Sequence, residues 1–279
     1  MPSDNKQSSI VTRIVPTGST LGIDWKDYWS HRELLYFLTL RDVRIRYKQT
    51  LIGIAWVVLQ PVLTTAILTV IFSTFARFET LNVPYPLFVL SGIVIWLFVH
   101  TAITITSGSF TNNTNLVTKV YFPRLIVPLA STLACILDLL ISLPILIVMM
   151  VYFGTGVSWQ IVMAPLFLLL AFVQTAAFGI FFSALNVRFR DVKFALPFFL
   201  QIWMLASPIF YPVSLLPEKW KIVFAVNPLT GIIEGFRASL FGTAFDWPVI
   251  GVSSLSILVI LAIALFVFRR MEDDFADLI

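Results

Sequence analysis

Six apolar segments, separated from one another by short polar breaks, constrain the fold more than any other feature of this sequence. About 20 predominantly apolar residues in a helix are enough to cross the hydrocarbon core of a bilayer. Over the whole chain 58% of residues are hydrophobic and 12% are charged, whereas a soluble domain is closer to about half apolar and a quarter charged. We therefore expect an all-α polytopic membrane protein. Its six transmembrane helices should lie near residues 51–76, 87–107, 125–153, 161–187, 195–213 and 247–268, within a membrane domain that covers 51–268.

Two regions precede the first apolar segment. Residues 1–23 are polar and lack the apolar core of a signal peptide, so we expect a disordered tail. Residues 24–50 are too charged to span, and Trp25 and Trp29 are four apart, so they share one face of a helix. We expect an amphipathic interface helix on the inner membrane surface, although an ordinary solvated helix is the alternative. The basic residues expected to face anionic lipid are Arg41, Arg44, Arg46 and Lys48.

The stretch 214–246 differs from the six segments, because prolines and glycines divide its apolar residues into short pieces. None of these pieces is long enough to cross about 30 Å of hydrocarbon. We expect a re-entrant or surface helical hairpin between the fifth and sixth spans, since a single crossing would place Arg269 and Arg270 outside. Within it, Glu234 and Arg237 are spaced to form an i,i+3 ion pair, and shaping an outer gate is the alternative role.

The positions of the basic residues predict the orientation. With six spans and both termini inside, fifteen Lys and Arg residues lie on the cytoplasmic side and four lie outside. Cytoplasmic loops carry such an excess of positive charge. We therefore expect a multi-pass protein of the bacterial cytoplasmic membrane that ends in a cytoplasmic tail at 269–279.

The polar break at 111–124, TNNTNLVTKVYFPR, lies between the second and third spans. Pro123 disfavours helical geometry at Phe122, so a preceding helix should end there, and Arg124 should begin the next span. A short basic loop of this kind is expected to stay in the cytoplasm. It is either a solvated turn or a docking segment for a cytoplasmic partner.

Several classes of chemistry are excluded by what the sequence lacks. It contains no G-x-x-x-x-G-K-[ST] phosphate loop, so the chain is not its own ATPase of that class. With Cys135 as the single cysteine and only two histidines, we expect no metal site, no catalytic site and no nucleic-acid partner. Asp138 is the clearest charged residue inside a span, and together with the distant His100 it would make a poor proton relay. Asp138 should therefore face a partner, line a cavity or be protonated.

Aromatic residues are abundant, with 26 Phe, 8 Trp and 7 Tyr. Their rings can line a path for sugars, which present apolar C–H faces, although most aromatics in membrane proteins face lipid or pack in the core. The candidates for such a path lie in the first and fifth spans: Trp56, Gln60, Phe72, Phe75, Trp203, Phe210 and Tyr211.

Four motifs, in order, resemble those of the membrane subunits of ABC-type polysaccharide exporters such as the O-antigen exporter permeases. They are RYKQT from Arg46 with Trp56 and Gln60-Pro61, then LVTKVYFPR from Leu116, then SPIFYP from Ser207, and finally NPLTG from Asn227 with Glu234 and Arg237. The resemblance covers about residues 30–270, and residues 1–25 match no part of the family pattern.

The resemblance implies a half-transporter that moves an undecaprenyl-linked glycan outward. Two copies of the chain would pair with two separate ATPase subunits, which would carry ATP and magnesium, and this chain would hold no cofactor. The first and fifth spans would line a channel at the homodimer interface. The residues expected to couple to the ATPase are Asn115, Lys119, Tyr121, Phe122 and Arg124.

Alternatives to an O-antigen remain open within this resemblance, because a capsule or teichoic-acid glycan would use the same fold. Outside it, a membrane glycosyltransferase would need acid and base residues gathered at one membrane face, and the sequence contains no such group. In a secondary transporter we would expect internal repeats with paired broken helices, and only the second half of this chain has apolar segments broken in this way.

Overall fold

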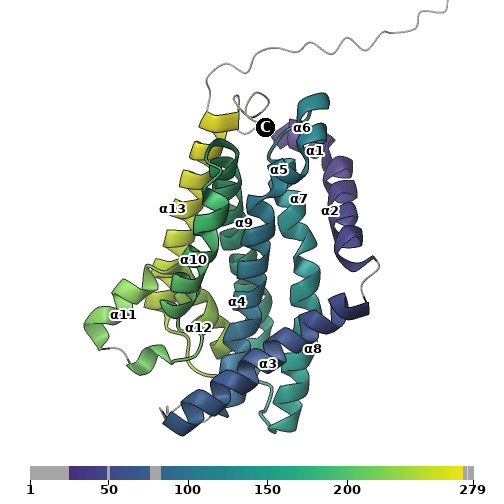
Figure 1. Ribbon diagram of the computed structural model, residues 1–279. Coiled ribbons are helices and arrows are strands. Elements are labelled where there is room, and N and C mark those ends of the chain that lie inside the picture. The colour runs from purple at the N-terminus through teal and green to yellow at the C-terminus, as the bar shows by residue number, and fades with distance from the viewer. Residues whose placement is uncertain (1–24, 49–50, 76–82, 216, 273–274, 276–279) are drawn as a thin grey trace, which may run out of the picture.

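The computed structural model describes residues 25–48, 51–75, 83–215, 217–272 and 275, and within these residues all regular secondary structure is helical (Figure 1). The tail predicted at 1–23 lies outside the described residues. Five helical segments are long and apolar enough to cross a membrane: Ala55–Phe72, Tyr85–Ser107, Ile126–Tyr152, Trp159–Arg188 and Trp247–Glu272. The prediction of an all-α multi-pass membrane protein is confirmed.

Most helix bounds agree with the predicted spans. The long single helices are α3 (Leu51–Phe75), α4 (Tyr85–Ser107), α9 (Ala164–Arg188) and α13 (Trp247–Glu272). The predicted third span is divided at Cys135 into α7 (Ile126–Ala134) and α8 (Ile136–Tyr152), where the Cys135 amide donates to the Thr132 carbonyl in a tighter i→i+3 turn. A short 3₁₀ turn, η1 (Trp159–Met163), leads into α9.

The predicted fifth span, 195–213, is shorter as a helix than the sequence suggested. It is α10 (Val192–Leu205), whose 14 residues extend about 21 Å at 1.5 Å per residue. Beyond it, Pro208 and Pro212 prevent a regular helix, and the chain passes through the turn η2 (Val213–Leu215). Because α10 alone does not reach about 30 Å, the count of six crossings stays a prediction.

The stretch after η2 contains two helices, α11 (Glu218–Ala225) and α12 (Pro228–Phe241), and their role as a re-entrant or surface hairpin stays a prediction. The α12 helix begins at Asn227, whose side chain accepts a hydrogen bond from the Leu229 amide, and Pro228 fits the first helical position. It ends at Gly242, whose φ of 71° is left-handed and favours glycine. The hairpin lies at one end of the bundle and α6 (Thr114–Lys119) lies at the other, which we call the α6 end (Figure 1).

The core is centred on α4, which is the most buried of the long helices, with α9, α3 and α8 packed around it. In lipid, apolar burial drives helix association only weakly, so close packing and internal hydrogen bonds must stabilise the bundle. A second apolar cluster lies near the α6 end, where the ring of Phe110 is 4.9 Å from that of Phe275. Phe275 is fully buried, so part of the predicted cytoplasmic tail packs against the bundle.

The predicted interface helix at 24–50 is two helices in the structure, α1 (Trp25–Ser30) and α2 (Arg32–Tyr47), which are separated at His31. Figure 1 shows α2 running beside α7. Its last turn reaches the start of α8, because Arg46 forms an ion pair with Asp138 there.

Candidate functional site

The segment from α5 (Ser109–Asn112) through α6 to Arg124 carries the predicted coupling residues and lies at the end of the bundle (Figure 1). The α6 helix ends at Lys119, three residues before the predicted stop at Phe122. Asn115 and Lys119 are exposed, and the Tyr121 ring is 78% exposed. An exposed aromatic ring beside a cation is a common feature of protein-binding surfaces.

Two of the predicted coupling residues lie on the inner side of this segment, and Phe122 attaches it to the bundle. Phe122 is buried in the apolar cluster near the α6 end, which also contains Leu38 and Phe268. Arg124 is half-buried, and its Nη1 makes no hydrogen bond within the described part of the chain. The segment therefore has an exposed outer side and an anchored inner side, as a docking element requires.

Polar contacts fix α2 to the bundle at two levels. At its last turn, Arg46 Nη2 lies 2.8 Å from Asp138 Oδ2, and the Tyr47 hydroxyl donates to Asp138 Oδ1. Nearer the α6 end, the Ser131 hydroxyl donates to Asp42 at 3.0 Å. Asp138 thus faces a partner, which was one of its three predicted states.

The four basic residues predicted to face anionic lipid differ in their surroundings. Arg44 and Lys48 are exposed. Arg46 pairs with Asp138, and Arg41 pairs with the adjacent Asp42 at 2.7 Å. Two of the four cations therefore bond to carboxylates of this chain.

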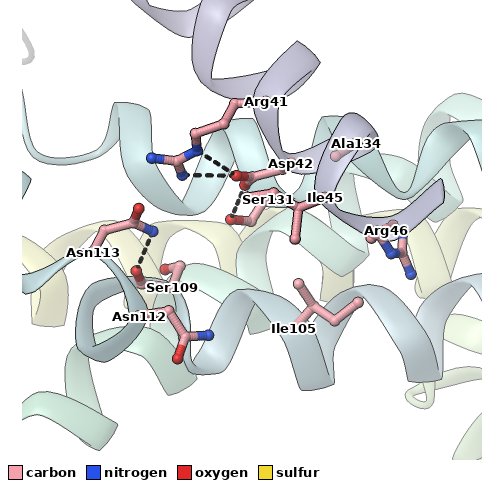
Figure 2. Close-up of a pocket in the computed structure, with 10 residues that line it drawn as sticks. All are labelled: Arg41, Asp42, Ile45, Arg46, Ile105, Ser109, Asn112, Asn113, Ser131 and Ala134. Carbon is pink, nitrogen blue, oxygen red and sulfur yellow. Dashed lines mark hydrogen bonds and ion pairs between the residues drawn. The ribbon is translucent and has the colours of Figure 1, made fainter. Parts of the chain in front are cut away.

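A cavity of about 380 Å³ lies between α2, the α4–α5 junction and α7 (Figure 2). Asn112 and Asn113, from the predicted docking segment, line it on one side, and Arg41 and Asp42 line it from α2. This cavity therefore lies where the docking segment and α2 meet.

The residues predicted to line a glycan path differ in how exposed they are and in which rings they contact. Trp56 in α3 is 53% exposed, and α3 is the least buried of the five candidate spans, with 11% of its stretch Ala55–Phe72 buried inside the chain. Phe72 of α3 stacks on Phe210 with ring centroids 5.4 Å apart, and Phe210 contacts Tyr211 edge-on. The structure thus brings together residues of the first and fifth predicted spans.

Other members of that set are placed differently. Trp203 is buried, packs against Phe178 and donates from Nε1 to Asn227 Oδ1 at 2.8 Å. Its position is therefore inside this chain rather than on the exposed side of α10. Gln60 is half-buried, and the side chain of Phe75 lies outside the described residues.

At the hairpin end, Arg237 of α12 forms the predicted i,i+3 pair with Glu234, at 3.1 Å. Arg237 also donates to the carbonyl oxygens of Phe88, Pro208 and Ile209, and its guanidinium lies over the Phe88 ring. These contacts hold the irregular chain after α10 against α4. Gly92 permits the approach, since a Cβ there would lie 2.8 Å from the Ile209 oxygen.

Several residues of these sites were not predicted from the sequence. Asp42 and Ser131 were not predicted because Asp42 resembles any charge on a solvated helix and Ser131 any small residue in a span. Ser109 carries no distinguishing pattern either. Pairing Asp138 with a cation of the N-terminal basic segment could have been predicted, since a charge inside a span requires a partner.

One protein family and several individual proteins are similar in sequence to this chain. A family described as "ABC-2 type transporter" matches residues 33–241. An O-antigen export system permease protein of Myxococcus xanthus is 25% identical over 256 residues, which are 90% of this chain and 97% of that protein. A protein of the same description from Klebsiella pneumoniae is 26% identical, covering 88% and 95% of the two chains. A polysialic acid transport protein of Escherichia coli is 23% identical, covering 85% and 92%.

Proposed function

The chain belongs to the ABC-2 type transporter family as a membrane subunit that is not itself the ATPase, and on that premise we propose that it exports a lipid-linked polysaccharide. It acts as the permease half of an ATP-driven exporter in the bacterial cytoplasmic membrane, with six crossings and both termini in the cytoplasm. Two copies assemble with two separate ATPase subunits. ATP and magnesium are bound by those subunits.

One observation carries the proposal: α3 is a long apolar helix that is largely uncovered by its own chain. Its exposed aromatic Trp56 and the Phe72–Phe210 stack lie on the two predicted spans, first and fifth, that would face a second copy. A homodimer that joins these surfaces would bury α3 and enclose an aromatic path. Aromatic rings along such a path let a glycan slide without one tight site.

An O-antigen is the glycan we favour, because two of the relatives described above are O-antigen export permeases. A capsule-type glycan is the second candidate, and the Escherichia coli polysialic acid transport protein favours it. Permeases for either glycan would share the same fold, so the two candidates differ in the chemistry of the glycan and not in the fold of the permease.

The test is ATP-driven transport in proteoliposomes that contain the chain and its partner ATPase. We expect undecaprenyl diphosphate-linked glycan added on the ATPase side to appear in the lumen with ATP, and not with a non-hydrolysable analogue. Transport without the ATPase would instead identify a channel or secondary transporter. Elongation of the glycan by the chain alone would identify a glycosyltransferase. Parallel runs with an O-antigen and with polysialic acid separate the two glycan candidates.

A further inference from the structure

The cavity between α2, α4–α5 and α7 is lined mainly by polar and charged side chains (Figure 2). Toward the α6 end it is lined by the guanidinium of Arg41, the amides of Asn112 and Asn113 and the side chain of Ser109. Ile105, Ala134 and Arg46 lie at the other end. A cavity of about 380 Å³ has room for a small polar group rather than for a glycan chain.

Ser109 provides an independent sign of a ligand. Its side chain is 2% exposed, and its hydroxyl oxygen has no hydrogen-bond partner among the described residues. Leaving a buried hydroxyl unpaired costs about 1–3 kcal/mol. A ligand oxygen in the cavity would satisfy this hydroxyl.

The hydrogen-bond donors of the lining suit an anion. Arg41 donates from Nε and Nη2 to one oxygen of Asp42, whose other oxygen accepts from Ser131. The remaining nitrogen of Arg41 points away from Asp42 in Figure 2. Arg46 also lines the cavity, but its charge is paired with Asp138 at 2.8 Å, so Arg41 is the cation placed to meet an anion. Guanidinium groups suit phosphate oxygens, which accept charge-assisted hydrogen bonds.

The outer wall suggests that the anion belongs to a lipid. Ile45 lines the cavity and is also 70% exposed, so the cavity borders the outer apolar side of α2. Phe37, four residues before Arg41 on the same side of the helix, is 64% exposed. An amphiphile could place its head in the cavity and its tail along these side chains.

We propose that this cavity binds the phosphate headgroup of a lipid in the inner leaflet. The phosphate belongs either to an anionic phospholipid or to the polyprenyl diphosphate that carries the glycan. The second source rests on the proposed function, whereas the first does not.

The experiment uses the chain in complex with its ATPase in dodecyl maltoside. Native mass spectrometry counts bound molecules during titration with phosphatidylglycerol, with undecaprenyl diphosphate, or with undecaprenol, which lacks phosphate. The variants are Arg41→Gln and Ser109→Ala. The matched control is Arg44→Gln, since Arg44 is an exposed cation of the same helix that does not line the cavity.

We expect Arg41→Gln to weaken phosphate-lipid binding about tenfold and Ser109→Ala about threefold, with Arg44→Gln unchanged. Ser109→Ala removes only an unpaired hydroxyl, so the lipid-free complex should remain as stable as before, and the loss of binding cannot be ascribed to unfolding. Undecaprenol should not bind at this site.

A preference of at least tenfold for either phosphate lipid assigns the source. Binding of phosphatidylglycerol alone supports a structural lipid and leaves the export proposal untouched. Equal losses in Arg41→Gln and Arg44→Gln with none in Ser109→Ala would overturn the proposal, because the headgroup would then be held by the basic surface of α2. Equal binding of undecaprenol would overturn it as well.

Discussion

Asp138, in the first turn of α8, lies 2.8 Å from the guanidinium of Arg46 in the last turn of α2. The two side chains are 14% and 21% exposed, so neither charge is fully hydrated. An unpaired carboxylate within a span costs roughly 3 kcal/mol on insertion scales, and Arg46 offsets that cost. Burial and the neighbouring Asp138 carboxylate raise the pKa of Tyr47 above its ordinary value, so Tyr47 remains a protonated donor to Asp138.

This pair gives the first prediction, which concerns stability. Asp138→Asn should destabilise the protein by about 1–3 kcal/mol, less than for a fully buried pair, because Arg46 would keep its charge without a carboxylate. Thermal unfolding in detergent measures the change. The effect of Asp138→Asn combined with Arg46→Gln should be smaller than the sum of the single effects.

Asp191→Asn is the control, since Asp191 is an exposed carboxylate at the start of α10 that makes no capping hydrogen bond. It should leave the unfolding temperature unchanged. Additive effects of Asp138→Asn and Arg46→Gln would show that the two residues do not stabilise α2 as a pair.

Much of this fold was predictable because apolar length and charge placement act locally. The bounds of α4 and α13 follow from where apolar residues begin and end, and the ends of α12 follow from Asn227, Pro228 and Gly242. The i,i+3 pair between Glu234 and Arg237 needs only helical spacing.

What could not be predicted depends on contacts between distant residues. The position of Trp203 depends on Asn227 and on rings from other helices, and no local pattern indicates it. The break in the third span at Cys135 and the burial of Phe275 also depend on tertiary packing. The cavity forms where four helices meet, α2, α4, α5 and α7, so only its cations could be picked out from the sequence.

The second prediction concerns the close contact at Gly92. A Cβ there would meet the Ile209 carbonyl oxygen at 2.8 Å and Arg237 Nη2 at 2.9 Å. Gly92→Ala should therefore destabilise the protein by about 1–3 kcal/mol, because the Arg237 contacts to the chain after α10 must shift. Gly251→Ala, in α13 with no atom within 4 Å of the added carbon, should be neutral or stabilising by up to about 1 kcal/mol. Equal unfolding temperatures for the two variants would contradict the tight packing.

The third prediction tests the proposed path. Trp56→Ala and Tyr211→Ala should each lower glycan export severalfold while membrane insertion and dimer assembly stay normal, because each removes a ring that would face the glycan. Export is measured as ATP-dependent arrival of glycan in proteoliposomes. Trp247→Ala and Tyr152→Ala are matched controls, since both rings are exposed outside the proposed path. Full export by the double variant Trp56→Ala, Tyr211→Ala would argue against an aromatic path here.

The fourth prediction is topological and follows from the fifteen-to-four distribution of Lys and Arg. Single cysteines at Lys219 and Thr243, in a background with Cys135 replaced, should react with an impermeant thiol reagent from the outside. A cysteine at Lys119 should react only after the membrane is permeabilised, as should one at Asp277. Labelling of Lys219 and Thr243 from opposite sides would rule out the hairpin and the six-span count.

The last prediction concerns the segment from α6 to Arg124, which we expect to dock on the separate ATPase and transmit its closure to α7. A short helix held by the buried Phe122 can pass on a rigid-body displacement, whereas an unanchored turn cannot. Lys119 and Tyr121 are the exposed side chains that a partner would meet. The variant Lys119→Glu, Tyr121→Ala should weaken ATPase binding about tenfold or more, because it reverses a charge and removes a contact ring.

Reversal of Arg124 is a harsher change, since this residue is half-buried and a glutamate there could perturb folding as well as docking. We therefore expect Lys119→Glu, Arg124→Glu to uncouple ATP hydrolysis from export and also to lower stability. Lys193→Glu, an exposed cation at the start of α10, is the matched control and should keep both activities. Retention of the ATPase on membranes, ATP hydrolysis and glycan export are measured on the same preparations. If Lys119→Glu, Tyr121→Ala keeps full ATPase binding and full export, the segment is a solvated turn, because no contact that drives transport then passes through its exposed side.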